Sequence, residues 1–521
     1  MNRWKKFKAS LGGEKELDLG SGTSRDSRSR SSRDSDQRSF EPSKAQIRSF
    51  KQAQRNFIAG DNSRLHEGWT TRGASIDHYL IQQLSVMQAR SSEQCYNNPL
   101  ARRFIRLMRR NISGSKGIII KPKSTFNGRL DDVANDAIQL AEEDWRENHC
   151  HYNGHMTMAQ IEKLNIATMV RCGEFVNILH FTGKYGVQLE VIDPELLDVT
   201  RNQIESNGDI TRLGVQRTKA GKITHYWFRE QDYYGNFSHG TFGNGRVYSR
   251  PARFVMHCFD HEYPSQSRGI PAMYSAIVRL KMLDGFDEAA LVAARAGASK
   301  MGFIKEDLSK ERETDYEGSQ IQDFDAGSIE RIDHEDDFIE FDPKYPHEFY
   351  APFTKKHQRD IAMGFDVSYA SMTGDLSDTN YSSIRWGGLD ERDAFEEYQE
   401  LFIACFRRPL YKEFIKNAIL RSQIKTNRGL PLSRPVTEYY TALIRGRRWP
   451  WVDPAKEMAA AEKAVQMKVK SRAQIIRDRG DDPEETWSEI EDENARLGDL
   501  LTSQTPQEQN NEQEDEEDED E

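Results

Sequence analysis

The stretch from Ser267 to Lys305, SRGIPAMYSAIVRLKMLDGFDEAALVAARAGASKMGFIK, constrains the fold of this chain more than any other. Pro271 suits the first turn of a helix, and no proline follows until Pro343. A helix from Pro271 to about Phe303 would run roughly 50 Å. Apolar residues recur at spacings of three and four and predict one helical face, formed by Met273, Ala276, Leu280, Leu283, Phe286 and Ala290.

The second half of this stretch, from Ala289 to Ala298, is mostly alanine, with Gly297 near its end. Small side chains let a helix approach its neighbours closely. Two interpretations therefore stay open: an ordinary buried helix, or a strut that packs against copies of itself.

Composition narrows the class of protein. The chain has 521 residues with a net charge of −11, and its mean hydropathy is −0.80. An acidic chain is not built to grip nucleic acid over a broad face, so any contact with DNA is expected to be local or weak. No run of eighteen apolar residues and no secretory h-region occurs, so no membrane association is expected. Five scattered cysteines without CxxC spacing indicate reduced thiols in a cytosolic setting.

The rest of the chain reads as a mixed α+β protein between two polar ends. A Ser/Arg/Asp-rich start and the acidic end EQNNEQEDEEDEDE are expected to be disordered. Helical patterns run from Ser43 to Ile112, and a β-rich region ends near Asp260. After Lys305 come an acidic insert, a second helix that starts after Pro352, and a polar loop. A third helix follows, kinked at Pro409, and then a turn and two helices.

Three clusters of residues are candidate chemical sites. His149, Cys150, His151 and His155 are potential zinc ligands, but adjacent residues point different ways and no second ligand pair stands nearby. The acidic residues Asp333 to Asp337, with His334, offer Mg²⁺ ligands for metal-assisted phosphodiester cleavage, although a solvated acidic loop is the simpler interpretation.

The third cluster is the basic helix that carries Arg102, Arg103, Arg106, Arg109 and Arg110. It can bind nucleic acid or pair with acidic neighbours in an assembly. The chain has no P-loop, no GxSxG elbow and no HExxH pair. We therefore predict no catalytic residue, no cofactor and no metal.

The absence of a catalytic constellation favours a role in structure and assembly. A long helix, an acidic insert, a returning helix and a polar loop suggest a strut, a tip, a return strut and a loop that projects inward. Copies that pack side by side would close into a ring. Ser, Thr, Asn and Gly in the loop would then touch a passing polyanion only weakly.

These segments resemble the lambda-type phage portal protein family. The resemblance rests on SRGIPAMYSAIVRLKMLDGFDEAALVAA, on RDIAMGFDVSYASMTGDLSDTNYSSIRWGGLDERDAF, on GEFVNILHF with VIDPELLD, and on VDPAKEMAAAEKAVQMKVKSRAQIIRDRGDDPEE. It spans about residues 40 to 497. One departure is Ala370, where the family's VSYE-like element would carry a glutamate.

The resemblance implies a portal fold with a mixed α/β wing, long stem helices, a small α/β clip, a kinked tunnel helix and a helical crown. The implied domains are a disordered tail (1–39), the wing (40–268), a first stem helix (269–304), the clip (305–350), a second stem helix (351–366), a tunnel loop (367–388), the tunnel helix and its return to the wing (389–449), the crown (450–497) and an acidic disordered tail (498–521).

It also implies a ring, usually of twelve subunits, at one capsid vertex of the virion, assembled in the host cytoplasm. Double-stranded DNA would be packaged and ejected through its channel. The implied partners are the terminase large subunit, head-completion (connector) proteins, and the major capsid and scaffold proteins. The alternatives are a metal-dependent DNA-processing enzyme or another virion adaptor protein.

The expected site residues form three groups. The DNA-channel group is Ser371, Thr373, Asn380, Ser382, Ser383 and Arg385, the clip-docking group is Asp307, Glu311, Asp315 and Glu317, and the stem-packing group is Ala289, Ala293, Ala296 and Gly297. Arg385 is the one cation of the loop, and it either approaches phosphates or pairs with Asp375 or Asp378.

Overall fold

A computed structural model describes residues 73–231, 246–298, 302–305, 337–340, 348–377, 381–449 and 454–497. Contacts divide the chain into Met1–Gly73 and Ala74–Glu521, and the elements below belong to the second unit. The N-terminal tail, the clip-docking residues, Asn380 and the acidic end lie outside the described residues.

Two helices, α2 (Ile76–Asn97) and α3 (Pro99–Ile112), follow each other closely. Asn98 lies between them and caps α3, because its side chain accepts a hydrogen bond from the backbone N–H of Leu100. The apolar side of α3, which includes Phe104, is buried, while most of its arginines are exposed. This amphipathic pattern fixes which side of α3 is left for other partners.

Two further helical segments precede the β-rich region. They are α4 (Asp132–Asp144), continued by the π-helical turn η3 (Trp145–His149), and α5 (Met158–Cys172). Trp145 is buried and donates a hydrogen bond from its indole Nε1 to the Val187 carbonyl, at 2.9 Å. The wide π turn thus ends α4 against the sheet that follows.

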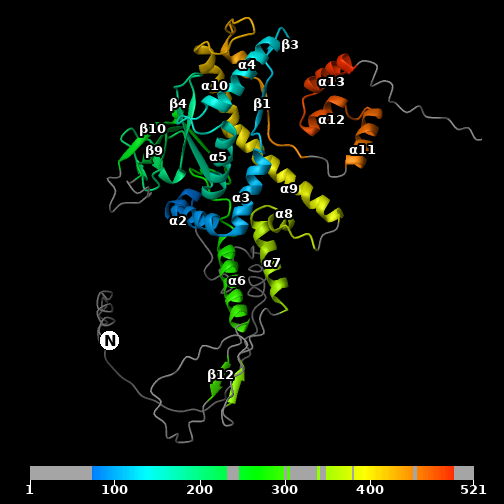
Figure 1. The fold of residues 1–521 in the computed structure, drawn as a ribbon. Helices are drawn as coiled ribbons and strands as arrows, with labels where there is room; N and C mark the ends of the chain where they lie inside the picture. Colours follow the sequence, from blue (N-terminus) through cyan, green and yellow to red (C-terminus); the bar gives the residue numbers. More distant parts are fainter. Residues whose placement is uncertain are drawn as a thin grey trace, which may run out of the picture. The chain divides into compact units, whose positions relative to one another are not determined.

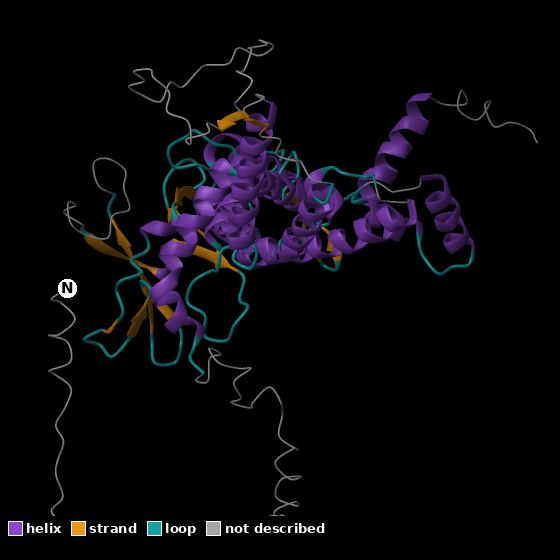
Figure 2. Ribbon diagram, turned by 90° about the horizontal axis from the view of Figure 1, so that it is seen from below, coloured by secondary structure: helices purple, strands orange, loops and turns teal. Residues whose placement is uncertain are grey.

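Two antiparallel sheets hold the β-rich region, with strand orders β11-β4-β5 and β10-β9-β8-β7-β6. Figure 1 shows β4, β9 and β10 on one side of α5, and Figure 2 shows most strands gathered at one side of the helices. The strands are β4 (Glu174–His180), β5 (Gln188–Ile192), β6 (Gln203–Ile204), β7 (Ile210–Arg212), β8 (Val215–Arg217), β9 (Ile223–Arg229), β10 (Val247–Pro251) and β11 (Val255–Phe259), with the 3₁₀ turns η4 (Pro194–Leu196) and η5 (Ala252–Phe254).

Shorter pairings tie distant parts of the chain together. Strand β1 (Ile119–Pro122) pairs antiparallel with β14 (Ala442–Arg445) across more than 300 residues of sequence. The hairpin of β2 (Thr125–Phe126) and β3 (Arg129–Leu130) follows β1, and the 3₁₀ turn η7 (Val436–Tyr439) precedes β14. The β1–β14 pair brings the late chain back to the region of α3 and α4.

The helices α6 (Ile277–Ala298) and α7 (Tyr350–Gly364) lie side by side (Figure 1). Between them in sequence, β12 (Gly302–Lys305) pairs antiparallel with β13 (Asp337–Glu340). After α7 come α8 (Tyr369–Thr373), α9 (Tyr381–Phe402), the π turn η6 (Ile403–Arg407) and α10 (Arg408–Leu420). The largest core cluster joins α3, α4, α5, α9, η6 and α10.

The first long helix begins later than the sequence predicts. Residues 272–276 form hydrogen-bonded turns, and α6 runs from Ile277 to Ala298 instead of from Pro271 to about Phe303. The backbone N–H of Tyr274 bonds the Pro271 carbonyl, three residues back, so these turns reproduce the apolar spacing of a helix.

The prediction of a polar loop over 367–388 is also wrong in part, because Tyr369–Thr373 and Tyr381–Gly388 are helical. Ser368 caps α8 by accepting a hydrogen bond from the Ser371 N–H. Extending the formed helix α9 by further residues costs less than nucleating a new helix, so it continues through Gly387 and Gly388.

The C-terminal segment contains three helices where the sequence predicts two: α11 (Pro454–Gln466), α12 (Arg472–Arg479) and α13 (Pro483–Leu497). Lys468 adopts a left-handed conformation with φ of 57°, which ends the run after α11. Ser471 then caps α12 by accepting a hydrogen bond from the Gln474 N–H. No helix among the described residues has the length and apolar character needed to cross a bilayer.

Candidate functional site

Helix α6 has one face that its own chain covers. Met273 and Ala276, from the turns before it, join Leu280 and Leu283 in the large core, and Ala290 is buried further along. The predicted face from Met273 to Ala290 is therefore occupied within the subunit, although Phe286 is only partly buried.

Helix α7 makes the contacts that hold this face. The Ser275 hydroxyl donates to the Gly364 carbonyl at 2.9 Å, and the Tyr350 hydroxyl donates to Asp287 at 2.9 Å. Arg279 and Asp360 form an ion pair at 2.7 Å. A methyl group on Gly364 would lie 2.8 Å from Ala276 Cβ, so glycine permits the close approach of the two helices.

The opposite face of α6 is apolar and exposed. Its residues are spaced by four, three, four and three, which places them in one stripe along the helix. This outer stripe consists of Val278, Met282, Gly285, Ala289 and Val292. Neither Gly285 nor Ala289 has a bulky side chain, so another helix could approach closely here.

A groove of about 840 Å³ runs beside the stripe between α6 and α7. Val278 and Met282 line it from α6, and Phe353 and Met363, both largely exposed, line it from α7. Within one chain this apolar surface has no cover among the described residues. Exposed apolar surfaces of this extent mark interaction sites.

The stem-packing residues predicted from the sequence divide among these surfaces. Ala289 belongs to the outer stripe, and Ala293 is half-buried at its edge. Ala296 and Gly297 are within α6, but their side chains are outside the described residues. The outer stripe was not predicted from the sequence, because the covered face has the larger and more regular set of apolar side chains.

The segment after α7 is held by internal hydrogen bonds. The hydroxyl of Ser371 donates to Glu391 of α9 at 2.7 Å, and Ser368 bonds the same carboxylate. The Thr373 hydroxyl donates to the Tyr369 carbonyl at 2.8 Å. Two of the predicted DNA-channel hydroxyls are thus engaged inside the subunit.

Asp375 already has an ionic partner. Lys355 lies 3.2 Å from its carboxylate, and the Ser377 and Tyr369 hydroxyls donate to it. These hydrogen bonds, first among them that from Ser377, hold the pKa of Asp375 well below its usual range. Ser382, Ser383 and Arg385 lie in the first turns of α9, but their side chains are not among those described.

Helix α9 carries an acidic face that was not predicted from the sequence. Asp390, Asp393, Glu397 and Glu400 are exposed and spaced by three, four and three, so they form an acidic face. None of the four pairs with a cation among the described residues. This spacing is visible in the sequence and could have predicted the acidic face.

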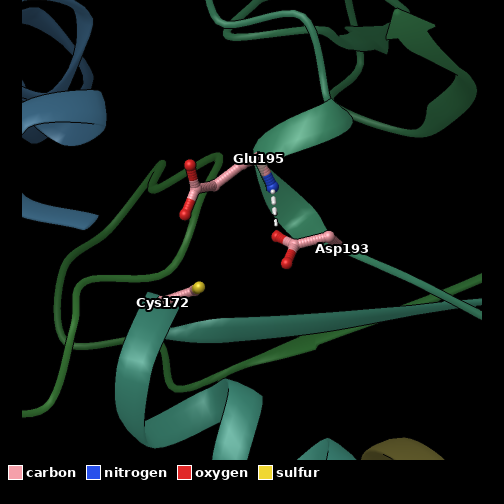
Figure 3. Close-up of side chains that lie close together, drawn as sticks. All are labelled: Cys172, Asp193 and Glu195. Carbon is pink, nitrogen blue, oxygen red and sulfur yellow. Dashed lines mark hydrogen bonds between the residues drawn. The ribbon is translucent and has the colours of Figure 1, made fainter. Parts of the chain in front are cut away.

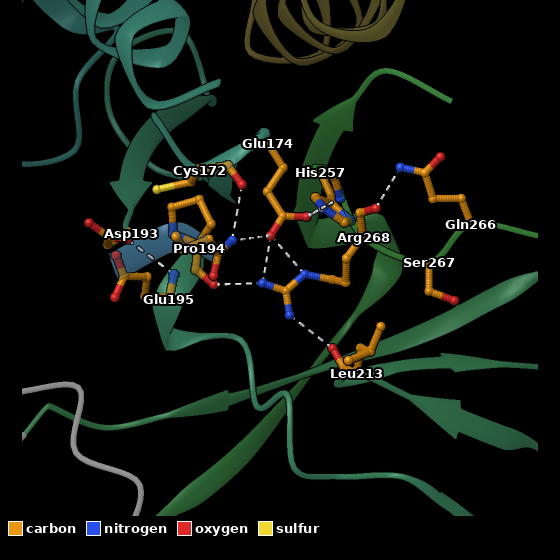
Figure 4. Close-up of polar contacts among 12 residues, drawn as sticks. Cys172, Glu174, Asp193, Pro194, Glu195, Leu213, His257, Gln266, Ser267 and Arg268 are labelled. Atoms are coloured by element: carbon orange, nitrogen blue, oxygen red, sulfur yellow. Dashed lines mark hydrogen bonds and ion pairs between the residues drawn. The ribbon is translucent and has the colours of Figure 1, made fainter. Parts of the chain in front are cut away.

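A buried arginine fixes the chain just before α6 (Figure 4). Arg268 donates to Glu174 at 2.8 Å and to the carbonyls of Leu213 and Pro194 at 3.0 and 2.9 Å. His257 lies 2.8 Å from the other oxygen of Glu174. Burial alone would raise the pKa of Glu174, but the charge of Arg268 and the hydrogen bond to His257 outweigh it and lower the pKa to about 2.

The backbone at this point is packed directly against β4. A Cβ on Gly269 would lie 2.1 Å from the Gly173 carbonyl oxygen, and a Cβ on Gly173 would lie 2.2 Å from the carbonyl carbon of Ile270. Only glycine permits this approach. The chain at Gly269 and Ile270, which leads into the turns before α6, is therefore held in one position against the start of β4.

A second buried arginine, Arg407, lies in the π turn η6. Its guanidinium is 3.0 Å from Glu162 of α5 and 3.2 Å from Glu142 of α4. Glu162 also accepts hydrogen bonds from the Ile118 N–H and the Ser113 hydroxyl. Burial raises the pKa of both carboxyl groups, because one cation faces two acids away from water.

One group among the described residues brings three metal-ligand types together: Cys172, Asp193 and Glu195 (Figure 3). Asp193 is already paired with Arg171 at 2.9 Å and accepts the Glu195 N–H. Burial raises the pKa of the Cys172 thiol and of the Glu195 carboxyl, which disfavours the charged forms a metal requires. We assign no metal to this group.

The predicted zinc candidates do not converge on one point. The Cys150 thiol donates to the Arg146 carbonyl at 3.3 Å, His149 faces Asp144 at 3.5 Å, and His151 Nδ1 accepts the His155 N–H. The acidic candidates Asp333 to Asp336 lie outside the described residues.

An uncovered apolar stripe and groove on a firmly anchored helix pair are features of a subunit built for association. The comparisons with known proteins give the family. Residues 62–399 match the family of phage portal proteins described as the lambda family. The chain belongs to the lambda family of phage portal proteins.

Two curated relatives are similar over most of their length. A probable portal protein of Halomonas phage phiHAP-1 is 30% identical over 458 residues, which cover 85% of this chain and 87% of that protein. The portal protein of Escherichia phage N15 is 21% identical over 459 residues, which cover 81% and 86%.

Solved structures of gene transfer agent particles show a weaker similarity. A chain from the neck of an empty particle, computed with C6 symmetry, has 14% identity and a TM-score of 0.40, with 77% of this chain and 94% of that chain covered. A chain from the neck of a native particle, computed with C12 symmetry, has 14% identity and covers 77% and 99%.

Proposed function

We propose that copies of this chain close into a ring, twelve in the arrangement that the family resemblance implies, and that DNA passes through its channel at one capsid vertex. The observation that carries the proposal is the outer stripe of α6. A helix whose two opposite faces are both apolar buries only one of them within its own subunit, so the other is left for a neighbour.

The stripe and groove also suit a ring rather than a two-fold pair. A closed ring requires one surface of each subunit to contact a different surface of the next. Gly285, Ala289 and Val292 of the stripe lie outside the groove, which is lined by Val278 and Met282 of α6 and by Phe353 and Met363 of α7. Contacts between the stripe of one subunit and the groove of the next can repeat around a rotation axis and close a ring.

The acidic face of α9 supports a channel that does not hold its cargo. Asp390, Asp393, Glu397 and Glu400 would repel phosphates, and a channel that binds DNA weakly offers little resistance to sliding. Because Ser371 and Thr373 are engaged internally, Asn380, Ser382, Ser383 and Arg385 are the predicted residues left to approach DNA.

The remaining assignments follow from the family resemblance. The clip, with Asp307, Glu311, Asp315 and Glu317, would dock the terminase large subunit and later the head-completion proteins. The wing and crown would face the capsid and scaffold proteins. The ring would assemble in the host cytoplasm and remain in the virion, with no catalytic step of its own.

Electron microscopy of the purified full-length chain tests this function. Negative-stain images should show closed rings with a central channel, and mass photometry should give one dominant species near twelve subunits. A chain that stays monomeric at tens of micromolar would refute the proposal. Mg²⁺-dependent DNA cleavage that Asp333→Ala abolishes would instead support a DNA-processing enzyme.

A further inference from the structure

A groove of about 450 Å³ between α3 and α5 is lined by arginines. Arg102, Arg106 and Arg109 come from α3, and Arg171 comes from α5, which also contributes Leu164 to the lining. The three residues of α3 are spaced by four and three, so they project from one face of the helix. We call this surface the arginine groove.

Three of the four cations in the arginine groove are unneutralised. Arg171 pairs with Asp193 at 2.9 Å. Arg102, Arg106 and Arg109 are exposed, and none of them pairs with an acid among the described residues. Like charges three and four positions apart destabilise a helix, so this arrangement favours a bound polyanion.

We propose that the occupant of the arginine groove is the acidic C-terminal segment of this polypeptide, residues 498–521. That segment has eleven acidic residues and no basic one, and nine of its last ten residues are Asp or Glu. The charge of the segment is therefore complementary to that of the groove over several successive residues. The inference does not depend on ring formation.

The segment is long enough to reach. Lys123, just after β1, contacts Asp482 at 3.3 Å, immediately before α13. Arg447, which leads towards the C-terminal helices, donates to the Arg110 carbonyl at 3.2 Å, at the end of α3. The last 24 residues, 498–521, could span up to about 80 Å, whereas α3 is only about 21 Å long.

This contact would have a consequence for DNA. Three clustered arginines are a local site for phosphates on an otherwise acidic chain. A segment tethered to the same polypeptide competes at an effective concentration of the order of millimolar. Covering the groove with the acidic segment would prevent the subunit from holding DNA there.

The test compares the full-length protein with a full-length variant in which the nine acids of residues 512–521 become Gln or Asn. The probe is a fluorescein-labelled synthetic peptide of residues 507–521, and anisotropy gives its Kd. The neutralised variant should bind the peptide at least about tenfold more tightly, because its own segment no longer competes. Raising the salt concentration from about 50 to 500 mM should weaken binding of the peptide to this variant.

Charge variants locate the contact. In the neutralised background, R102E/R106E/R109E should abolish peptide binding. R102Q/R106Q/R109Q, which removes the charges without reversing them, should weaken binding and serves as the test if the reversal disturbs folding. The matched control is K219E/K222E/K412E, which makes the same charge change at three exposed lysines elsewhere and should retain binding.

Two results would overturn the inference. One is equal peptide affinity for the wild-type and neutralised proteins, or equal losses in the arginine and lysine triples. The other is a labelled DNA duplex that binds the arginines equally tightly in both proteins, because the groove would then be an open DNA site.

Discussion

Replacing Met282 by aspartate tests the outer stripe directly. Met282 is 71% exposed in the single chain, so the substitution should leave the folded subunit intact. Burying the side chain in a neighbour is worth about 1–2 kcal/mol, most of the roughly 1.5–3 kcal/mol for full burial. An unpaired carboxylate in the same place adds at least about 2–3 kcal/mol of desolvation.

Together these effects weaken each contact between subunits by about 4 kcal/mol, or roughly a thousandfold in the association constant. Every subunit of a ring carries the substitution, so no contact escapes it. Mass photometry at 1 µM should show monomers for Met282→Asp and rings for the wild-type protein. Circular dichroism spectra of the two proteins should be the same, because the substitution leaves the subunit folded.

Leu140→Asp is the matched control, because Leu140 is 61% exposed in the middle of α4 and should leave the rings unchanged. Rings of normal size and stability in Met282→Asp would refute the assignment of the stripe. Rings lost equally in both variants would show that any added charge disrupts assembly.

Three further predictions concern the buried anchors. Gly269→Ala should destabilise the subunit by several kcal/mol in urea unfolding, because its Cβ would lie 2.1 Å from a carbonyl oxygen. Gly387→Ala in α9, where a Cβ would meet no other atom, should instead stabilise the subunit by about 0.5–1 kcal/mol. Arg407→Ala should cost about 3–5 kcal/mol and Glu142→Gln little or nothing, because only the first leaves buried carboxylates without a cation; equal losses would contradict this account. Glu174 has a depressed pKa, so its contribution of about 3 kcal/mol to the free energy of unfolding should be complete above pH 4.5 and lost as the pH falls towards 2. The melting temperature of Glu174→Gln should therefore approach that of the wild-type protein over this pH range, and a constant difference would contradict the account.

Most regular elements could be predicted from the sequence because each carries a local signal. Asn98 with Pro99 marks the start of α3, and the apolar pairs Phe175–Val176 and Ile178–Leu179 mark β4, the central strand of its sheet. The break between α11 and α12 also has a signal, since Ser471 and Gln474 have the spacing of a capping box, but no glycine or proline lies between the two helices.

The candidate interaction surfaces were less predictable, because contacts between elements far apart in the sequence decide which side chains stay exposed. Ser371 and Thr373 read as loop residues free to meet DNA, yet both hydroxyls have partners in the fold, one of them Glu391, twenty positions away. Periodicity placed one apolar face on α6 correctly. It could not tell whether that face or the opposite one would be covered by α7, because both are apolar.

The two buried arginines indicate how a subunit with exposed apolar surfaces keeps a defined shape. Glu162 lies in α5 and Glu174 is the first residue of β4, which follows α5 directly, and each binds an arginine from a distant element. Arg268 thereby fixes the start of α6, and Arg407 fixes the π turn between α9 and α10. Apolar packing alone would tolerate small sliding of these helices, whereas a buried carboxylate loses its partner when they move. In the proposed ring, an error in the direction of α6 would repeat at every contact and prevent closure, so buried charge would fix the geometry within the subunit while apolar area would drive association between subunits.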